Sequence, residues 1–308
     1  GEHICTLGPI IHNPQVIEDL QSKGVTILDD IKNATDNRKV VIRTHGVEKD
    51  VLKYCEDNSL NFIDATCPFV KKIHRIVEKN SSESLPVLIA GDKNHPEVVG
   101  IKSYCNGACY IFNSCAELEQ IFSNNDFNKE KPFLVVSQTT FSTKEWKKCV
   151  KIIKLHYTNA KIFDTICNVT ENRQTETDRI AGEADIMFVI GGKGSSNTQK
   201  LYDICRQRCA QTYFVESPPD VPRHLLQPHM CAGITAGAST PDSIIQEVKK
   251  LMSEIEIMEE NFAQMLDESF KTLNTGDVVK GVITSISANE IHVDIGSKVT
   301  GILSFNDV

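Results

Sequence analysis

The sequence has no excess of basic residues and no long apolar run. Its 33 lysines and arginines are outnumbered by 41 acidic residues, which gives a formal net charge of −8. A protein that mainly neutralises nucleic-acid phosphates should be basic, so that role does not account for the whole chain. No apolar run approaches the roughly 20 residues of a membrane-spanning helix, and no signal peptide is visible. We therefore expect no association with a membrane.

Glycine and proline are too few for a collagen-like or low-complexity chain, at 17 and 11 of 308 residues. Apolar residues make up 40% and charged residues 24%, a balance that can bury a core and differs from that of disordered proteins. At roughly 100–200 residues per domain, this length predicts two or three domains.

The cysteines include no Cys-x-x-Cys pair, which argues against zinc-ribbon and thioredoxin-like motifs. There are eleven cysteines, an odd number, scattered through segments that can form an ample core without disulfides. We therefore expect a reducing, cytoplasmic location, with some cysteines buried and a few bound to metal.

From Gly1 to about Leu251 the pattern alternates between strand and helix. Each apolar segment is followed by a short polar loop and a helical pattern, and the expected strands are residues 40–43, 61–63, 86–90, 132–136, 185–190 and 230–234. This alternation predicts an α/β fold of parallel sheets covered on both faces. Ligands of such folds bind at the carboxyl ends of the strands, so we expect these loops to converge on one site.

Residues 62–67 and 162–167 resemble each other, and each segment places an aspartate three residues before a cysteine. They predict two similar units that each contribute one thiolate, Cys67 and Cys167. From spacing alone these are candidates for zinc, iron–sulfur or redox thiolates. A third unit at the same spacing would have its cysteine before Gly1, and a first residue that is not Met agrees with a fragment or a processed chain. We therefore expect the first unit to be incomplete.

The loop at residues 191–197 is the strongest candidate for binding an oxyanion. Its glycines let a phosphate approach the backbone, and Ser195, Ser196 and Asn197 add donors at the start of a helix. It is not a Walker A loop, because the Gly-Lys-Ser/Thr ending is missing. A lone loop of this kind is more often an ordinary helix cap, but residues 235–240, which include Ser239, repeat the pattern and favour a phosphate.

Three histidines, His12, His45 and His95, lie in short loops at the ends of predicted strands. A charged imidazolium can bind phosphate oxygens, and a neutral imidazole can relay protons. Glu97 is a candidate general acid, because enclosure in a water-poor cavity would raise its pKa. Each also has a plainer explanation: capping for a single histidine, and helix-dipole preference for a glutamate in the first turn.

With these loops in place, residues 1–251 resemble the 4-hydroxy-3-methylbut-2-enyl diphosphate reductases, the last enzymes of the non-mevalonate isoprenoid pathway. The matching segments, in order, are residues 7–13, 43–47, 64–68, 95–98, 138–140, 195–197 and 235–239. The resemblance implies a reductase region at residues 1–255, with α/β units at about 1–66, 67–166 and 167–255 around a central [4Fe–4S] cluster.

The same resemblance implies a role for each matching residue. Cys67 and Cys167 would hold the cluster. The third cysteine ligand is expected upstream of Gly1, and Cys5 is a poor substitute, so the printed chain is expected to be inactive. Substrate diphosphate would be bound by His12, His45, Ser195, Ser196, Asn197 and Ser239. The catalytic residues would be His95, Glu97 and Thr139, of which His95 and Thr139 would also bind the substrate. The implied reaction is reductive dehydroxylation to isopentenyl and dimethylallyl diphosphates, with electrons from a donor such as ferredoxin or flavodoxin.

The last part of the chain has a different pattern. Residues 256–274 combine helical apolar spacing with an acidic excess and predict an acidic helical linker. Residues 275–308 read as short strands and resemble, through residues 276–281 and 293–296, the opening of the OB-type RNA-binding repeat of a ribosomal protein. An OB-fold needs about five strands, so we expect a partial all-β barrel, with binding to RNA or the ribosome only through the complete region of a longer parent.

Two other functions stay open from spacing alone. One is an RNA- or ribosome-associated binding protein that uses the α/β region as a platform. The other is a cluster-free phosphate-binding enzyme in which Cys67 and Cys167 are merely buried. The phosphate-directed loops, the acidic net charge and the half-finished barrel disfavour the first of these.

Overall fold

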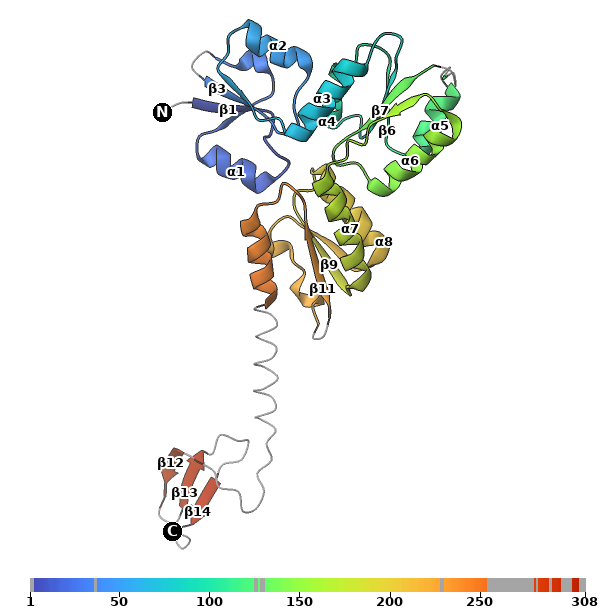
Figure 1. Cartoon of the computed structure of the whole chain (residues 1–308). Coiled ribbons are helices and arrows are strands. Elements are labelled where there is room, and N and C mark those ends of the chain that lie inside the picture. Colours follow the sequence, from blue (N-terminus) through green and yellow to red (C-terminus); the bar gives the residue numbers. More distant parts are fainter. Residues whose placement is uncertain are drawn as a thin grey trace. The chain divides into compact units, whose positions relative to one another are not determined.

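Parallel sheets hold all the described strands of the first part of the chain (Figure 1). The computed structural model describes residues 3–35, 38–124, 127, 131–227, 230–253, 280, 282–287, 290–294 and 301–304. Internal contacts divide the chain into two units, Gly1–Val248 and Lys249–Val308. In the first unit, strands and helices alternate and form three parallel sheets, so the predicted α/β class with parallel sheets is confirmed.

The first sheet has the strand order β2–β1–β3–β4. Its core forms where Cys5, Val40 and Ile42 of the two central strands pack with Cys55 of a covering helix. The strands are β1 (His3–Leu7), β2 (Thr26–Leu28), β3 (Arg38–Ile42) and β4 (Phe62–Asp64), and the helices are α1 (Pro14–Ser22), the 3-10 helix η1 (Ile31–Asn33) and α2 (Lys49–Asp57).

The second sheet has the order β6–β5–β7–β8, and every residue of its two central strands is buried. Successive side chains of a strand point to opposite faces, so Val87 packs with Ile73 on one side and Leu88 packs with Trp146 on the other. The strands are β5 (Val87–Ala90), β6 (Cys109–Phe112), β7 (Phe133–Ser137) and β8 (Ala160–Ile162), and the helices are α3 (Pro68–Asn80), α4 (Pro96–Ser103), α5 (Cys115–Asn124) and α6 (Thr143–His156).

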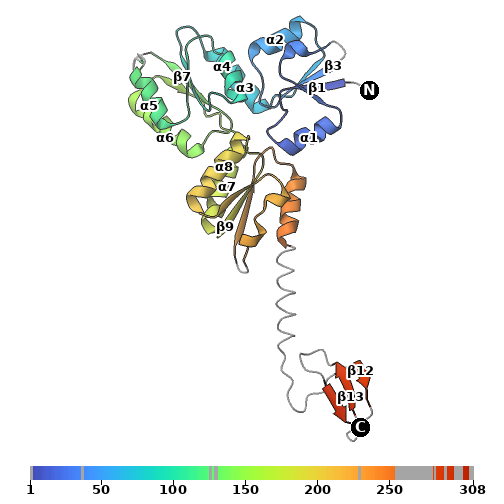
Figure 2. The ribbon, with the colours of Figure 1, turned by 180° about the vertical axis from the view of Figure 1, so that it is seen from behind.

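The third sheet has the order β10–β9–β11. Helices α7 and α8 lie side by side on one face, and the helical residues 242–248 lie on the other (Figures 1 and 2). The strands are β9 (Ile186–Ile190), β10 (Thr212–Val215) and β11 (Ala232–Ala236), and the other elements are α7 (Asn168–Glu183), α8 (Ser196–Arg208) and the 3-10 helices η2 (Pro218–Asp220) and η3 (Arg223–Leu225).

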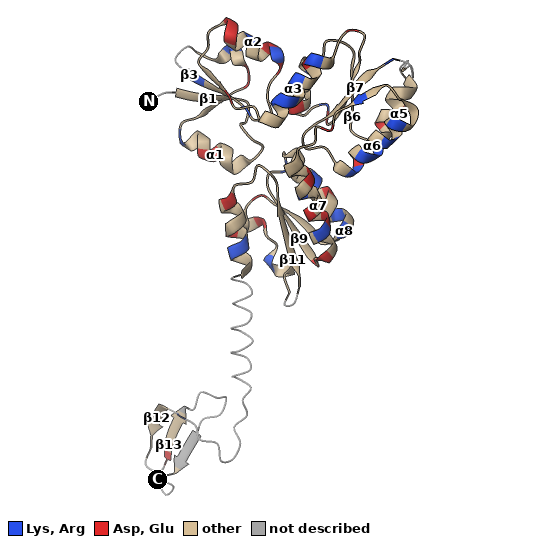
Figure 3. Cartoon of the chain, viewed as in Figure 1, with Lys and Arg blue, Asp and Glu red and all other residues tan. Residues whose placement is uncertain are grey.

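Charged residues occur along helices α6, α7 and α8 of the second and third sheets (Figure 3). Asp178 of α7 forms ion pairs with Lys144 of α6 at 2.6 Å and with Arg208 of α8 at 2.9 Å. Hydrogen bonds from Arg208, and next the one from Lys144, lower the pKa of Asp178 to about 2. The Lys144 pair therefore connects helices of two different sheets, and the Arg208 pair connects two helices of the third sheet. Among the residues that the structure describes, no helix is both long and apolar enough to cross a membrane.

The second unit contains a small antiparallel sheet of β12 (Val282–Ile286), β13 (Glu290–Asp294) and β14 (Gly301–Ser304), paired in chain order. Besides this sheet, the described residues of the unit are 249–253, 280 and 287, and these described parts include no closed barrel. The predicted acidic linker at residues 256–274 lies outside the described residues.

Candidate functional site

A cavity of about 420 Å³ lies where loops from all three parallel sheets meet. Most of these loops follow the carboxyl ends of strands, which is where ligands of open α/β sheets bind. All eleven site residues expected from the sequence line this one cavity: His12, His45, Cys67, His95, Glu97, Thr139, Cys167, Ser195, Ser196, Asn197 and Ser239.

Cys67 and Cys167 occupy equivalent positions in two sheets. Each is the N-cap residue of a helix, α3 or α7. The backbone N–H of Cys67 donates to the Thr44 carbonyl at 2.9 Å, and that of Cys167 donates to the Thr139 carbonyl at 3.0 Å. The repeated aspartate also has a local role: Asp64 accepts a hydrogen bond from the N–H two residues later, as Asp164 does in the second copy. These bonds direct both cysteines to the cavity.

The two thiols have the chemistry and the placement of metal ligands. Both cysteines are half-buried and line the cavity rather than being enclosed in the core, and neither is in a disulfide. Cys5, in contrast, is fully buried in β1. Two cysteines, Cys67 and Cys167, are among the described residues that line the cavity. The donor set therefore fits a thiolate-ligated iron–sulfur cluster through two of its ligands.

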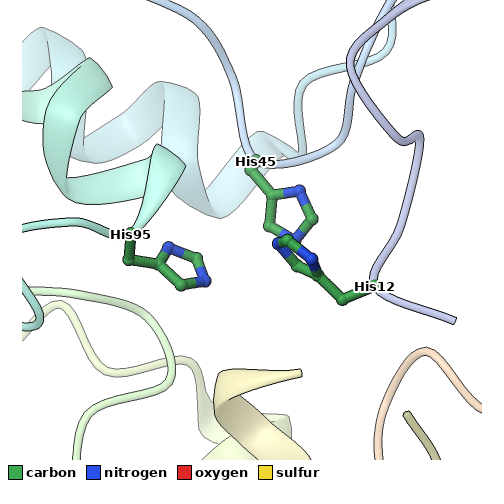
Figure 4. A group of neighbouring side chains, drawn as sticks. All are labelled: His12, His45 and His95. Carbon is green, nitrogen blue, oxygen red and sulfur yellow. The ribbon is translucent and has the colours of Figure 1, made fainter. Parts of the chain in front are cut away.

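Three imidazoles from the first two sheets form one group (Figure 4). Ring centroids are 4.4 Å apart for His12 and His45, 5.4 Å for His45 and His95, and 5.7 Å for His12 and His95. Burial, together with neighbouring positive charge, lowers the pKa of His45 to about 3 and that of His95 to about 4, and it lowers the pKa of His12. The three rings are therefore neutral near pH 7.

Several polar atoms at the cavity are buried without a hydrogen-bond partner. They are His12 Nε2, His45 Nδ1, and both amide atoms of Asn197. Buried polar atoms are rarely left unpaired, so these atoms indicate a polar ligand. Three neutral imidazoles are a suitable ligand set for a divalent metal, and they are equally suitable donors to an anion.

Glu97 is a buried carboxyl group, only 2% exposed. Its Oε1 accepts the Thr139 N–H at 2.6 Å, and its Oε2 accepts the Thr139 hydroxyl at 2.8 Å. Burial raises the pKa of Glu97 to about 7, although the two Thr139 hydrogen bonds oppose the rise. Desolvation outweighs the hydrogen bonds here, so Glu97 can hold a proton near neutral pH and release it inside the cavity.

The loop between β9 and α8 brings hydroxyl and amide groups to the same cavity. Ser195 is the N-cap of α8, and its hydroxyl accepts the N–H of Thr198 at 3.3 Å. A Cβ at Gly192 would lie 2.5 Å from the backbone oxygen of His12, so only glycine lets this loop approach the first sheet so closely. The helix N-terminus and the histidine group therefore face one cavity.

The sequence did not single out Arg43, Gln138 and Thr140 as site residues. Thr140 lines the cavity, and its hydroxyl is 3.1 Å from that of Ser196. Gln138 donates to both hydroxyl oxygens, at 3.0 Å to Thr140 and 3.4 Å to Ser196. Arg43 is a partly buried cation whose charge helps lower the pKa of all three histidines. All three residues lie in segments that match the reductase family, and this was a signal that they belong to the site. The contacts between sheets could not be deduced from the spacing of residues in the sequence.

Comparisons with known proteins agree on one family. The family profile described as LytB protein matches residues 1–253. A 4-hydroxy-3-methylbut-2-enyl diphosphate reductase of Caldanaerobacter subterraneus is 41% identical over 264 residues, covering 84% of this chain and 88% of that relative. One from Clostridium tetani is 37% identical over 314 residues, covering 99% of this chain and 47% of the relative.

A solved structure of (E)-4-hydroxy-3-methyl-but-2-enyl diphosphate reductase, described as the terminal enzyme of the non-mevalonate pathway, is also similar. It matches with a TM-score of 0.57 and 37% identity, over 82% of this chain and 88% of that one.

Proposed function

This chain belongs to the LytB protein family, and from that premise we propose that it is the catalytic region of a 4-hydroxy-3-methylbut-2-enyl diphosphate reductase. The reaction replaces the allylic hydroxyl of the substrate with hydrogen: two electrons and two protons enter, and water leaves. The products are isopentenyl and dimethylallyl diphosphates. The observation that carries the proposal is the single cavity that combines anion-binding loops, a protonated carboxyl group and two thiols.

Diphosphate is bound by the polar groups that lack partners in the protein. The imidazoles of His12 and His45 and the amide of Asn197 supply these unpaired atoms. His95 lies beside the two imidazoles, and its Nδ1 accepts the N–H of Glu97. Ser195, Ser196 and Ser239 add hydroxyl donors, which accompany the start of helix α8. An anion beside the imidazoles raises their pKa, so binding is coupled to proton uptake by the histidines. The fixed diphosphate positions the small allylic end of the substrate.

Glu97 delivers the proton that turns the hydroxyl into water. The raised pKa keeps the proton on its carboxyl group near pH 7. The Thr139 hydroxyl lies 2.8 Å from Glu97 Oε2. Because a hydroxyl can both accept and donate a hydrogen bond, it relays the proton from Glu97 toward the substrate. The buried site excludes competing water, so the proton is released only to a group bound in the cavity.

Cys67 and Cys167 are the residues that would hold a [4Fe–4S] cluster. When bound, such a cluster supplies the two electrons and a Lewis-acidic iron. The electrons come from an external one-electron donor such as ferredoxin or flavodoxin. Both thiols line the cavity, which disfavours the cluster-free phosphate-binding enzyme, because cysteines that only pack in the core, as Cys5 does, need not face the ligand.

Residues 275–308 belong, in this proposal, to an OB-type RNA-binding region joined to the reductase by an acidic linker. Support comes from the three antiparallel strands β12, β13 and β14, and from the exposed apolar side chains of Val282, Ile283 and Ile286. The alignment with the Clostridium tetani relative covers 99% of this chain and 47% of the relative. Salt-sensitive RNA binding by the gene product, lost when residues 275–308 are deleted, would test the assignment.

The test of the reductase proposal uses the gene product that contains this sequence, purified without oxygen. Iron and sulfide should copurify with it, and turnover of the allylic diphosphate should depend on Glu97. We expect Glu97→Gln to keep iron and sulfide but to lower kcat by about 10²–10⁴-fold, the usual contribution of a general acid. Glu83→Gln, at an exposed position, is the matched control. An iron-free protein, or full turnover by Glu97→Gln, would contradict the proposal.

A further inference from the structure

A second cluster of metal-ligating side chains lies outside the cavity, between helices α5 and α6. Cys115 Sγ is 3.1 Å from Cys149 Sγ, and the donor atoms of Cys115, Cys149 and Glu145 all lie within 4.8 Å of one another. None of the three lines the reductase cavity. Nothing in the proposed reaction uses them.

Local capping places each of the three side chains. Ser114 caps α5, accepting the N–H of Glu117 at 3.2 Å, which puts Cys115 at the first position of that helix. Ser142 caps α6 and accepts the N–H of Glu145. Glu145 and Cys149 are four residues apart, so they share one face of α6.

The two helices are joined at this point by a hydrogen bond. The N–H of Cys115, which has no partner inside α5, donates to Glu145 Oε1 at 2.8 Å. The backbone of α5 therefore holds the Glu145 carboxylate of α6 beside Cys115.

The surroundings combine an apolar wall with one opening. Cys149 is fully buried in the core cluster that contains Trp146 and Phe133, whereas Cys115 is half-buried. Lys148 Nζ lies 3.3 Å from Glu145 Oε2. Two thiolates and one carboxylate carry three negative charges, which a divalent cation and Lys148 together neutralise.

We propose that Cys115, Glu145 and Cys149 bind a zinc ion. Zinc takes cysteine sulfur and carboxylate oxygen in tetrahedral sites, and an open fourth position is filled by water. Both thiol protons leave to solvent on binding, and no electrons are transferred. Each carboxylate oxygen accepts more than one contact, so Glu145 can keep its bond to the Cys115 N–H while it binds the metal.

Zinc accounts for the geometry better than a disulfide between the same cysteines. Two sulfurs at about 2.3 Å from one tetrahedral zinc are about 3.8 Å apart, so the pair must open by about 0.7 Å. A disulfide of about 2.05 Å requires the pair to close by about 1 Å, and it leaves Glu145 with only its contacts to the Cys115 N–H and to Lys148. Only a metal uses all three donors.

The experiment measures zinc in the intact, anaerobically purified protein. Elemental analysis gives zinc and iron per chain, and zinc K-edge X-ray absorption reports only the zinc ligands, whatever the iron content. We expect one zinc per chain, with two sulfur ligands at about 2.3 Å and oxygen ligands at about 2.0 Å. Cys115→Ser and Cys149→Ser should each lower zinc at least tenfold without changing iron, and Glu145→Gln should weaken zinc binding.

Two control variants separate this site from the reductase cavity. Cys231→Ser, at an exposed cysteine, should keep the zinc. Cys67→Ser should lose iron and keep zinc, so failure of the reductase proposal and failure of the zinc site give different results. Cys149 is in the core, so circular dichroism must show that its variant is folded. If it is not, Cys115→Ser and Glu145→Gln decide the outcome.

Three results would overturn the zinc site. Zinc retained in Cys115→Ser would show that the ion is bound elsewhere, and zinc lost in Cys67→Ser would place it in the cavity. The protein could also lack zinc and have a mass lower by two hydrogens. If Cys115→Ser abolishes that mass loss, the two cysteines form a disulfide instead.

Discussion

The buried carboxyl group of Glu97 should make the stability of the protein depend on pH in a way that one substitution removes. Its pKa is raised from an ordinary 4.5 to about 7 by burial. At 1.36 kcal/mol per pKa unit, the carboxylate form destabilises the folded protein by about 3 kcal/mol. Glu97→Gln keeps the shape of the side chain and has no charge to bury.

The direction of this pH dependence follows from which state, folded or unfolded, holds the Glu97 proton. Between pH 4.5 and 7 the unfolded chain has released the Glu97 proton, whereas the folded protein still holds it. The free energy of unfolding therefore falls as the pH rises through this window, and above pH 7 it stays lower by about 3 kcal/mol. The substitution also suits Thr139, because a glutamine amide offers one acceptor for its N–H and one donor for its hydroxyl, as the protonated acid does.

The assay is urea unfolding of both proteins from pH 5 to pH 8. The variant should gain about 2.5 kcal/mol relative to the parent between pH 5 and pH 8, because the contributions of all other titrating groups cancel in the difference. Glu83→Gln, at an exposed position, should show no such trend. A difference between Glu97→Gln and the parent that does not change with pH would refute the burial argument. It would also remove the reason for assigning Glu97 as the proton donor.

Three further substitutions test other parts of the site. Thr139→Val removes a hydroxyl that stabilises the Glu97 carboxylate, so the fall of kcat with rising pH should move to a higher pH; an unchanged profile would contradict the relay. Gly191→Ala should lower the free energy of unfolding by about 1–3 kcal/mol in thermal melts, because φ is +145° and its Cβ would lie 2.7 Å from Thr240 Oγ1; equal melting temperatures would contradict this. Ser196→Ala should raise KM about tenfold (about 1.4 kcal/mol) with little change in kcat, and an unchanged KM would remove Ser196 from substrate binding.

The elements of the fold were largely predictable because their signals are local. The expected strand at 185–190 corresponds to β9 at Ile186–Ile190, since a continuous apolar run marks a strand covered on both faces. The strand predicted at 230–234 begins and ends two residues later in the structure, where β11 is Ala232–Ala236. This segment is rich in small residues and has little pattern of its own, so its parallel pairing with β9 decides where it begins and ends.

Glu97 shows the limit of local reasoning within the site. A glutamate in the first turn of a helix is commonly an exposed group that favours the helix dipole, and the spacing around Glu97 fits that explanation. Its burial results from contact with Thr139, 42 positions later in the chain. The Cys115, Glu145 and Cys149 cluster likewise has no sequence motif, because its members come together only when α5 packs on α6.

The sequence by itself determined which chemical groups follow each strand, because a residue's identity and its place at a strand end are set by neighbours in the chain. It thereby supplied the histidines, the serine-rich loops and both cavity cysteines. Only the tertiary structure decided that loops of three sheets share one cavity, that the imidazoles are neutral and that Glu97 keeps its proton. Distances and desolvation depend on how separate sheets pack together, and no local pattern encodes them.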